Sequence, residues 1–418
     1  MRVLWFSVSP SLYSDNGNNQ GLGWIASIER IVRMDKDITL GIAFEYGDEV
    51  FKVEQESVTY YPMNVFHDRK DIENRHYHVD IEERLFMPYC LRVIDDFKPD
   101  VIQVFGSEWC FGLIQEYTDI PVVIHIQGSM PPYQNAMFPP GYSWWEEHAQ
   151  IPWWNFRWRN RHTLWRKRNL EVVTREERIL RGGKHFMGRT DWDYALSRLY
   201  APESNYYKCW EALRPVFIKG TVQWQPDKNR KKYIIVSTGP SRLKGMDVIL
   251  KTARLLKENS DIDFEWRIIG ATPAYLSEHE HKWGIDSMKN NVRPLGVLDG
   301  DAVCRELLDC DLYVLPTYID NSPNSVCEAM CLGVPVVSTL TGGLPSLIKN
   351  YRTGELVPCN DPYTLAFTLR TLLADVDKRM QYGWAAREIA LQRHNPEAIL
   401  NTIKTVYKEI LNNKSDVR

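Results

Sequence analysis

Short runs of apolar residues alternate along this chain with longer stretches in which apolar residues recur every three to four positions. The short runs are typical of buried strands, and the longer pattern is typical of helices that cover a sheet. Strands are predicted at 3–8, 39–44, 101–105, 121–128, 185–190, 233–237, 265–269, 313–315 and 354–358, and helices at 24–34, 81–97, 191–200, 246–257, 301–308 and 346–350, with further helices closing the chain. This alternation predicts an α/β fold of two doubly wound domains that face each other across a cleft.

A charged connector separates the two halves of this pattern. The run from Asp227 to Lys232 interrupts the apolar alternation just before a new strand begins at Tyr233. At 418 residues the chain is also too long for a single core. We therefore predict an N-terminal domain over 1–222 and a C-terminal domain over 223–393, with a terminal helix at about 394–418 packing back on the first domain.

Composition narrows the class of protein. The formal net charge of −3 gives no general attraction to nucleic acid. The eight cysteines contain no Cys-x-x-Cys pair and stand apart from histidines, which argues against a zinc site or a disulfide framework. No apolar run approaches the roughly 18 residues of a membrane span, and the N-terminus lacks the core of a signal peptide. We expect a cytoplasmic protein with reduced thiols, soluble or peripheral at the inner face of the plasma membrane.

The stretch 313–338 carries the strongest indication of a binding site. It predicts a buried strand, a polar loop, a helix that begins near Asn324 or Ser325, and a second buried strand. A strand-to-helix turn of a parallel sheet lies at its carboxyl edge, where ligands of open α/β folds bind. The free N–H groups and positive dipole end of the helix favour an anion such as a nucleotide diphosphate. Asp320 and Glu328 flank this turn.

Three loops are predicted to converge at that edge of the second sheet: 239–245, 295–298 and 318–325. Lys244 and Arg242 are the cations of the first loop and could neutralise a diphosphate. A carboxylate repels phosphate, so Glu328 is better suited to bind hydroxyls such as a ribose diol, and Asp320 another hydroxylated group. Helix capping and a surface ion pair are the structural alternatives for the two acids.

The N-terminal half has weaker indications. The first strand is followed by a loop with Gly21 and Gly23, which could bring backbone amides close to a ligand or could serve only as a turn. His125 and Gln127 share one face of a strand near its carboxyl end, and Arg189 ends another strand at a polar turn. These three side chains are candidates for a functional role at the carboxyl edge of the sheet, although a strand histidine is often structural.

The segment 144–184 interleaves tryptophans with arginines. Trp154, Trp158 and Trp165 are predicted to form one helical stripe, and Arg157, Arg161 and Arg168 the adjacent one. Such a helix could lie at an anionic membrane surface or bind a phosphorylated acceptor. The structural alternative is a core-facing tryptophan stripe with a solvated basic face. No nucleic-acid-binding motif accompanies the arginines.

Taken together, these motifs resemble the retaining, group 1 (family 4) glycosyltransferases of the GT-B fold, which has two Rossmann-like domains. The family pattern of two acids separated by seven residues and followed by Ala-Met-x-x-Gly-x-Pro-Val-Val reads here Asp320…Glu328-Ala329-Met330-Cys331-Leu332-Gly333-Val334-Pro335-Val336-Val337. The sequel Gly342-Gly343-Leu344-Pro345 and Thr353-Gly354-Glu355-Leu356-Val357 also matches, as do Lys244-Gly245 and Gly21-x-Gly23. The resemblance is specific over about 230–390 and looser over 1–200.

The resemblance implies a nucleotide-sugar donor on the C-terminal domain and an acceptor on the N-terminal domain. It assigns catalytic roles to Lys244, Asp320 and Arg242, with Lys244 stabilising the leaving diphosphate and Asp320 binding sugar hydroxyls. It assigns Glu328 to the ribose, and His125, Gln127 and Arg189 to positions near the acceptor or the sugar. The other donor-binding residues would be Gly21, Gly23, Gly239, Gly296, Asn321, Ser322, Asn324 and Ser325. It also implies no metal, no cofactor, and retention by same-face attack.

The chain departs from the family pattern at four points. The first acid is Asp320 rather than the commoner glutamate, and the glycines between the acids are replaced by Asn321-Ser322-Pro323-Asn324. The family's arginine falls at Gly239, so Arg242 is its candidate substitute. The family's N-domain histidine aligns with Gln127, with His125 as its neighbour.

The leading hypothesis is a transfer of sugar from a nucleotide-sugar donor to a glycan or lipid-linked glycan, in bacterial surface-polysaccharide assembly. A GT-B nucleotide-sugar epimerase and a non-catalytic nucleotide-sugar-binding protein are the alternatives. A dinucleotide oxidoreductase is disfavoured because no Gly-x-Gly-x-x-Gly follows a strand.

Overall fold

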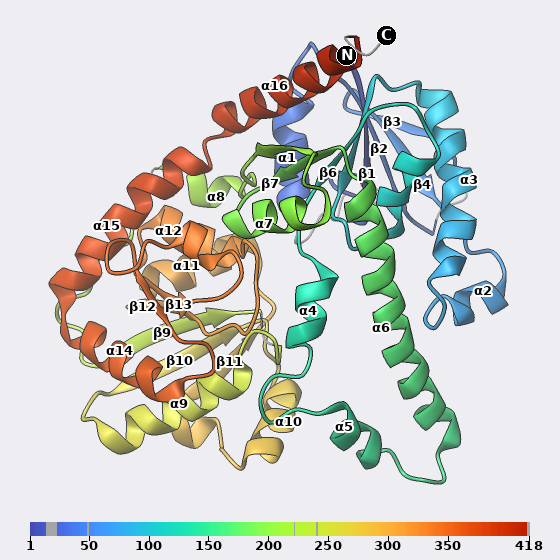
Figure 1. The fold of residues 1–418 in the computed structure, drawn as a ribbon. Coiled ribbons are helices and arrows are strands. Elements are labelled where there is room, and N and C mark those ends of the chain that lie inside the picture. The colour runs from blue at the N-terminus through green and yellow to red at the C-terminus, as the bar shows by residue number, and fades with distance from the viewer. Residues whose placement is uncertain (14–22, 48–49, 221, 240, 416–418) are drawn as a thin grey trace. The chain divides into compact units, whose positions relative to one another are not determined.

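The protein folds as two α/β units, each built on a largely parallel sheet (Figure 1). The computed structural model describes residues 1–13, 23–47, 50–220, 222–239 and 241–415. Unit 1 comprises Met1–Ala212 and Pro396–Arg418, and unit 2 comprises Leu213–Asn395. The predicted class of two parallel-sheet domains is confirmed.

The sheet of unit 1 has the order β3-β4-β2-β1-β5-β6-β7-β8, and each neighbouring pair is parallel except β3 with β4. The chain builds outward from β1 through β2 to β4 and then returns to β5 on the other side of β1, so the direction of winding reverses between β1 and β5. The strands are β1 (Arg2–Ser7), β2 (Thr39–Glu45), β3 (Val53–Gln55), β4 (Val58–Met63), β5 (Val101–Phe105), β6 (Val122–His125), β7 (His185–Gly188) and β8 (Asn205–Lys208).

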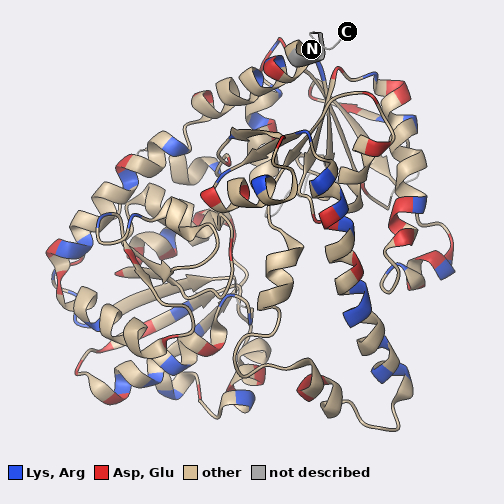
Figure 2. Ribbon diagram, in the orientation of Figure 1, with Lys and Arg blue, Asp and Glu red and all other residues tan. Residues whose placement is uncertain are grey.

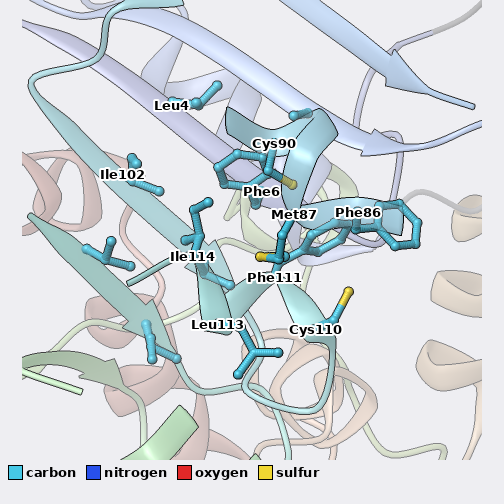
Figure 3. Packing of buried hydrophobic residues seen from close by; sticks show 14 of the residues in the cluster. Leu4, Phe6, Phe86, Met87, Cys90, Ile102, Cys110, Phe111, Leu113 and Ile114 are labelled. Carbon is cyan, nitrogen blue, oxygen red and sulfur yellow. The ribbon is translucent and has the colours of Figure 1, made fainter. Parts of the chain in front are cut away.

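The helices of unit 1 are α1 (Trp24–Val32), α2 (Arg69–Asn74), α3 (Asp80–Phe97), the 3-10 helix η1 (Cys110–Glu116), α4 (Met130–Ala136), α5 (Trp144–Gln150), α6 (Phe156–Gly182), α7 (Asp191–Tyr200) and α16 (Pro396–Ser415). Of these, α3 and η1 pack on one face of the sheet, and α1 and α16 pack on the other. Figure 3 shows the core on one face, where Phe86 and Met87 of α3 and Phe111 of η1 pack over Phe6 of β1. Burial of such side chains stabilises the layer by roughly 1.5–3 kcal/mol each.

On the other face, the C-terminal helix α16 returns to unit 1 and packs against α1 and β5. Its Tyr407 hydroxyl accepts a hydrogen bond from Trp5 Nε1 at 3.0 Å and donates to Gln103 Oε1 at 2.5 Å. Both hydrogen bonds are buried, so the polar groups that α16 brings into this apolar layer have partners there.

Unit 2 has a six-stranded, wholly parallel sheet of order β11-β10-β9-β12-β13-β14. The strands are β9 (Tyr233–Thr238), β10 (Phe264–Ile269), β11 (Val292–Gly296), β12 (Leu312–Leu315), β13 (Val336–Thr339) and β14 (Glu355–Val357). Its helices are α8 (Pro215–Ile218), α9 (Met246–Asn259), α10 (Pro273–Trp283), η2 (Met288–Asn290), α11 (Gly300–Asp309), α12 (Asn324–Leu332), α13 (Leu344–Leu347), α14 (Pro362–Ala374) and α15 (Val376–Arg393). Winding reverses between β9 and β12, which makes their carboxyl ends the switch point of the unit.

The boundary between the units lies earlier than the sequence suggested. Residues 213–222 were predicted in the N-terminal domain, but the structure groups them with unit 2. There α8 packs on α11 and α12, and Trp224 donates from its backbone N–H to the Leu332 carbonyl at 2.8 Å and from its indole to the Cys310 carbonyl at 2.6 Å. These contacts attach the connector to the second core before the charged run begins.

The segment 144–184 is not one helix. Residues 151–155 separate α5 from α6, so Trp154 lies before α6. The prediction that Trp154 shares a helical stripe with Trp158 and Trp165 is therefore wrong. Trp153, Trp154 and Trp158 are 70%, 66% and 57% exposed, which makes the core-facing interpretation wrong for these three.

Other local predictions hold to within a few residues, with two exceptions. The predicted strand 121–128 ends at His125, and the helix predicted at 346–350 is instead Leu344–Leu347. The eight cysteines form no disulfide, and seven are buried. Across the described residues, we find no helix with the length and apolar character needed to cross a membrane.

Candidate functional site

The loops that follow β9 and β12 touch at the switch point of unit 2. The Tyr318 N–H donates to the Leu243 carbonyl at 2.8 Å, and the Thr317 hydroxyl donates to the same oxygen at 2.8 Å. Gly245 begins α9 with a φ of +76°, and a Cβ there would lie 1.9 Å from the Pro316 carbonyl oxygen. Only glycine permits this approach of the two backbones.

This contact brings Lys244 and Asp320 together. Lys244 Nζ forms an ion pair with Asp320 Oδ2, although 75 residues separate them in sequence. The Asp320 side chain is almost fully buried, whereas that of Lys244 is about one-third exposed. The sequence predicted both residues at one site, and the structure places them in direct contact.

Asp320 is held by the loop after β13 as well. The Gly343 N–H donates to its carbonyl at 2.9 Å, and a Cβ on Gly342 would lie 1.9 Å from that same oxygen. The Asn321 N–H donates to Asp320 Oδ1 at 3.0 Å. The paired glycines that follow β13 therefore fix the backbone on which the carboxylate stands.

Glu328 lies in the second turn of α12 and is 4% exposed. Arg214 binds it in a bidentate pair, with Nε to Oε1 and Nη2 to Oε2 both at 2.9 Å. Burial raises the pKa of Glu328 above its ordinary value, and the hydrogen bonds and charge of Arg214 oppose that rise. Sequence reasoning missed Arg214, which stands outside the recognised motif and meets Glu328 only through the packing of α8 on α12.

A chain of hydroxyls joins the end of β9 to the start of α12. Thr238 Oγ1 lies 2.7 Å from the Tyr313 hydroxyl, which donates to Ser325 Oγ at 2.7 Å. Burial raises the pKa of Tyr313, so the phenol stays neutral and available as a donor. Asn324 and Ser325 begin α12 as predicted, and the first N–H groups of a helix have no partner within it.

The remaining predicted donor-site residues lie around this centre. Asn321 and Ser322 are buried, and Arg242 is half-buried in the turn that ends at Lys244. Gly239 and Gly296 have positive φ angles of +66° and +69°, with open space where a side chain would stand. Gly296 ends β11, two strands away from β9, so it belongs to the same edge but not to the central contact.

In unit 1, the predicted residues separate into core and edge. His125 is fully buried, with Nδ1 3.3 Å from Gln103 Nε2, and burial lowers its pKa to about 3. This neutral histidine is a core residue, which corrects its prediction as a substrate-facing group. Arg189 donates to the Gln127 carbonyl at 2.6 Å and lies 5.0 Å from the Trp24 ring. Gly23 precedes α1, and Gly21 lies outside the described residues.

Two acids at the carboxyl edge of unit 1 were also missed. Glu108 follows β5, and burial raises its pKa. Burial and the nearby Glu108 raise the pKa of Glu176 to about 7, while Ser107 Oγ at 2.7 Å and the Met130 N–H at 2.6 Å bind its carboxylate. The strand-edge rule applied to 101–105 could have found Glu108, whereas Glu176 comes from the C-terminal part of α6 and had no sequence signature.

Residues 219–389 match the family model described as glycosyl transferases group 1, which confirms the resemblance for this segment. Over 165 residues the chain is 32% identical to the putative colanic acid biosynthesis glycosyltransferase WcaL of Escherichia coli. That match covers 37% of this chain and 40% of WcaL, so it spans less than half of the relative.

Two solved structures show the same fold over nearly the whole chain. Sucrose-phosphate synthase from Thermosynechococcus elongatus has a TM-score of 0.72 at 16% identity and covers 99% of both chains. HepE from Anabaena, solved with UDP and glucose, has a TM-score of 0.64 at 14% identity and covers 98% of this chain and 100% of its own. These neighbours place the chain in the GT-B fold class.

The Arg214–Glu328 pair leads to a testable prediction. Arg214→Gln leaves a buried carboxylate without its cation, and we expect the free energy of unfolding to fall by about 3 kcal/mol at neutral pH. Without Arg214, the pKa of Glu328 rises further. A carboxyl group with a raised folded pKa destabilises the protein while ionised, so the deficit should shrink as pH falls from that pKa toward the ordinary carboxyl range. Urea unfolding across this pH range measures it.

The double variant Arg214→Gln/Glu328→Gln removes the buried charge and should recover most of the loss. Arg305→Gln, an exposed change on α11 of the same unit, serves as the matched control. A double variant as unstable as Arg214→Gln alone would show that the charge of Glu328 is not the cause.

Proposed function

We propose that this protein moves a sugar from a nucleotide-sugar donor to a glycan or lipid-linked glycan in bacterial surface-polysaccharide assembly. The match of residues 219–389 to the family model of the group 1 glycosyl transferases supports this proposal. The observation that carries the proposal is the meeting of Lys244 and Asp320 at the switch point of unit 2. Nucleotides bind doubly wound sheets at this place. The name of WcaL, which refers to polysaccharide biosynthesis, and the presence of UDP in the HepE structure support it.

Donor binding is proposed to exchange the partners of this ion pair. The diphosphate attracts Lys244, and the first N–H groups of α12 offer a second positive end. Asp320 is then released to accept hydrogen bonds from hydroxyls of the donor sugar. As the bond to the leaving diphosphate breaks, Lys244 and the helix end stabilise the growing negative charge, with Arg242 of the same turn assisting.

Glu328 is proposed to bind the ribose of the donor. Arg214 occupies one side of both carboxylate oxygens and holds the group in a fixed plane. Each oxygen of a carboxylate retains a further lone pair, so two neighbouring ribose hydroxyls can donate to Glu328 without displacing Arg214. Gly239 and Gly296 leave space at the same sheet edge for the rest of the nucleotide.

Unit 1 is proposed to bind the acceptor at the carboxyl ends of β5, β6 and β7. Gln127 and Arg189 stand there, beside the acids Glu108 and Glu176. Of these groups, Glu176 has a pKa of about 7, so it can exchange a proton near neutral pH.

We assign the reaction a retaining, metal-independent course. The acceptor oxygen bonds to the anomeric carbon on the face that the phosphate leaves, and the departing phosphate oxygen takes the acceptor proton. We expect the first-formed product to keep the donor's anomeric configuration by proton NMR, and the rate to be unchanged in EDTA. An inverted product, or a rate that EDTA abolishes and Mg²⁺ restores, would contradict this assignment.

The donor site is tested by binding and turnover together. A panel of nucleotide sugars at millimolar concentration should include at least one that raises the melting temperature, since a ligand at 100 times its dissociation constant adds about 2.7 kcal/mol. Lys244→Gln should lower kcat by roughly 100-fold or more while changing donor affinity less, because its charge acts mainly on the leaving group. Radiolabelled sugar transfer to a membrane extract measures turnover.

Arg254→Gln, an exposed change on α9, is the matched control and should behave as the wild type. The proposal fails if no nucleotide sugar shifts the melting temperature, or if Lys244→Gln and Arg254→Gln are indistinguishable. Epimerisation of the donor without transfer would instead support the epimerase alternative.

The α5–α6 segment is proposed to contact the membrane that carries a lipid-linked acceptor. Trp145, Trp153, Trp154 and Phe156 are each at least 66% exposed. Residues 148–170 contain six arginines or lysines and no acidic residue, and Figure 2 shows these basic positions along α6. Exposed aromatics beside cations suit the interface of an anionic bilayer.

Co-sedimentation with vesicles tests this contact. The protein should bind phosphatidylglycerol vesicles several-fold better than phosphatidylcholine vesicles, and 0.5 M salt should weaken binding because the basic residues contribute through screened charge. Trp153→Ser/Trp154→Ser should reduce binding, whereas Phe367→Ser, an exposed aromatic change in unit 2, should not. Binding that is equal for both lipids would argue against the proposal.

A further inference from the structure

A cavity of about 620 Å³ lies within unit 1, on one face of α6. Its walls include Trp158, Arg161, His162, Trp165 and Arg168, which recur at helical spacing and therefore share a face. Trp109, after β5, and Arg75, after α2, close other sides. The volume is in the range of about 300–1,000 Å³ that is usual for small-molecule sites.

The cavity has more positive charge than its own acids balance. Arg75 pairs with Glu45, but Arg168 and Arg175 share the single carboxylate of Glu82. Arg161, half-buried in the wall, has no acidic partner among the described residues; the contact that it makes is with the Trp158 ring at 5.7 Å. Two arginines face the one carboxylate of Glu82, which leaves one positive charge unbalanced there, and Arg161 adds a second. These two charges favour an anionic ligand.

The aromatic wall at Trp165 is held in place before any ligand arrives. The Trp165 ring stacks on His162 at 5.8 Å and 18°, and His162 stacks on Trp144 at 5.2 Å and 11°. Trp144 is buried, so this column is anchored in the fold. A fixed indole face is a platform for the apolar face of a flat ring, and fixed platforms lose little entropy on binding.

The cavity is connected to the edge where the acceptor is proposed to bind. Arg175 forms an ion pair with Glu82 and donates to the Glu108 carbonyl at 2.8 Å, and Trp109 is the next residue in the chain. A ligand in the cavity therefore lies against the same loop that carries Glu108. This continuity suits a second sugar of an acceptor whose first sugar lies at the carboxyl end of β5.

We propose that this cavity binds an anionic saccharide, a pyranose ring bearing a carboxylate or a phosphate, as an outer part of the acceptor. The ring stacks on the indoles of Trp158 and Trp165, and Arg161 binds the anionic group with the surplus charge at Arg168. The description of this ligand as part of the acceptor rests on the proposed function. Binding of the saccharide to the cavity requires neither donor nor turnover.

Isothermal titration calorimetry on the full-length protein, without nucleotide, tests the inference. The probes are a hyaluronan tetrasaccharide, which carries uronates, glucose 6-phosphate, neutral chitotetraose, inorganic phosphate and UMP. We expect one of the first two to bind at least tenfold more tightly than the last three, and the better one identifies the anionic group as uronate or phosphate.

Arg161→Gln and Trp165→Leu should each weaken that binding tenfold or more. Arg181→Gln, an exposed change on the same helix outside the cavity, should leave it unchanged. Because Arg161 has few contacts to lose, Arg161→Gln should have the melting temperature of the wild type. This measurement separates a loss of binding from a loss of folding.

Several results would overturn the inference. These are equal binding of chitotetraose, inorganic phosphate or UMP, no binding of any saccharide, and an Arg161→Gln effect confined to vesicle co-sedimentation. The melting shift with nucleotide sugars is measured on the same preparations. A retained shift without saccharide binding refutes only the cavity assignment, and saccharide binding without any nucleotide-sugar shift refutes only the donor site.

Discussion

In unit 2, the loops after β9 and β12 come so close that a Cβ on Gly245 would lie 1.9 Å from the Pro316 carbonyl oxygen, and the candidate site depends on this contact. Winding of the sheet reverses between these strands, so their following helices leave to opposite faces and their loops remain side by side. Gly245 lets the loops touch, because any side chain there would collide with the Pro316 carbonyl. Lys244 and Asp320 are neighbours of that contact, and they meet because the two backbones do.

Buried acids are compensated in different ways in this protein. Asp320 is paired with a lysine and fixed by N–H groups from its own loop and the loop after β13. Glu328 is paired with an arginine in a planar bidentate geometry, and the charge and hydrogen bonds of that arginine oppose the rise in pKa that burial causes. Glu108 and Glu176 lie close together and have raised pKa values. The first two acids each face a cation, whereas in the third arrangement the pKa of Glu176 reaches about 7.

The α5–α6 segment combines features that a purely structural helix would not retain. Its tryptophans divide between a buried anchor, Trp144, and exposed rings on either side of the start of α6. Its cations outnumber the acids that they face. Exposed indoles and uncompensated guanidinium groups both cost stability or solubility, so their concentration on one face favours a role in binding. A lipid surface and an anionic saccharide would use different parts of this segment.

The alternating pattern of apolar runs was enough to predict two parallel-sheet domains, because buried strands and amphipathic helices each have a characteristic period. The motif from Asp320 to Val337 was enough to predict that these residues lie at the edge of the second sheet, since strand, turn and helix are local. Tertiary structure alone decided which groups meet. Arg214 reaches Glu328 through the packing of α8 on α12, and Glu176 reaches the edge of β5 from the C-terminal part of α6. His125 is enclosed by aromatic neighbours. Such contacts join residues distant in sequence, and no local period records them, because they depend on how whole elements pack.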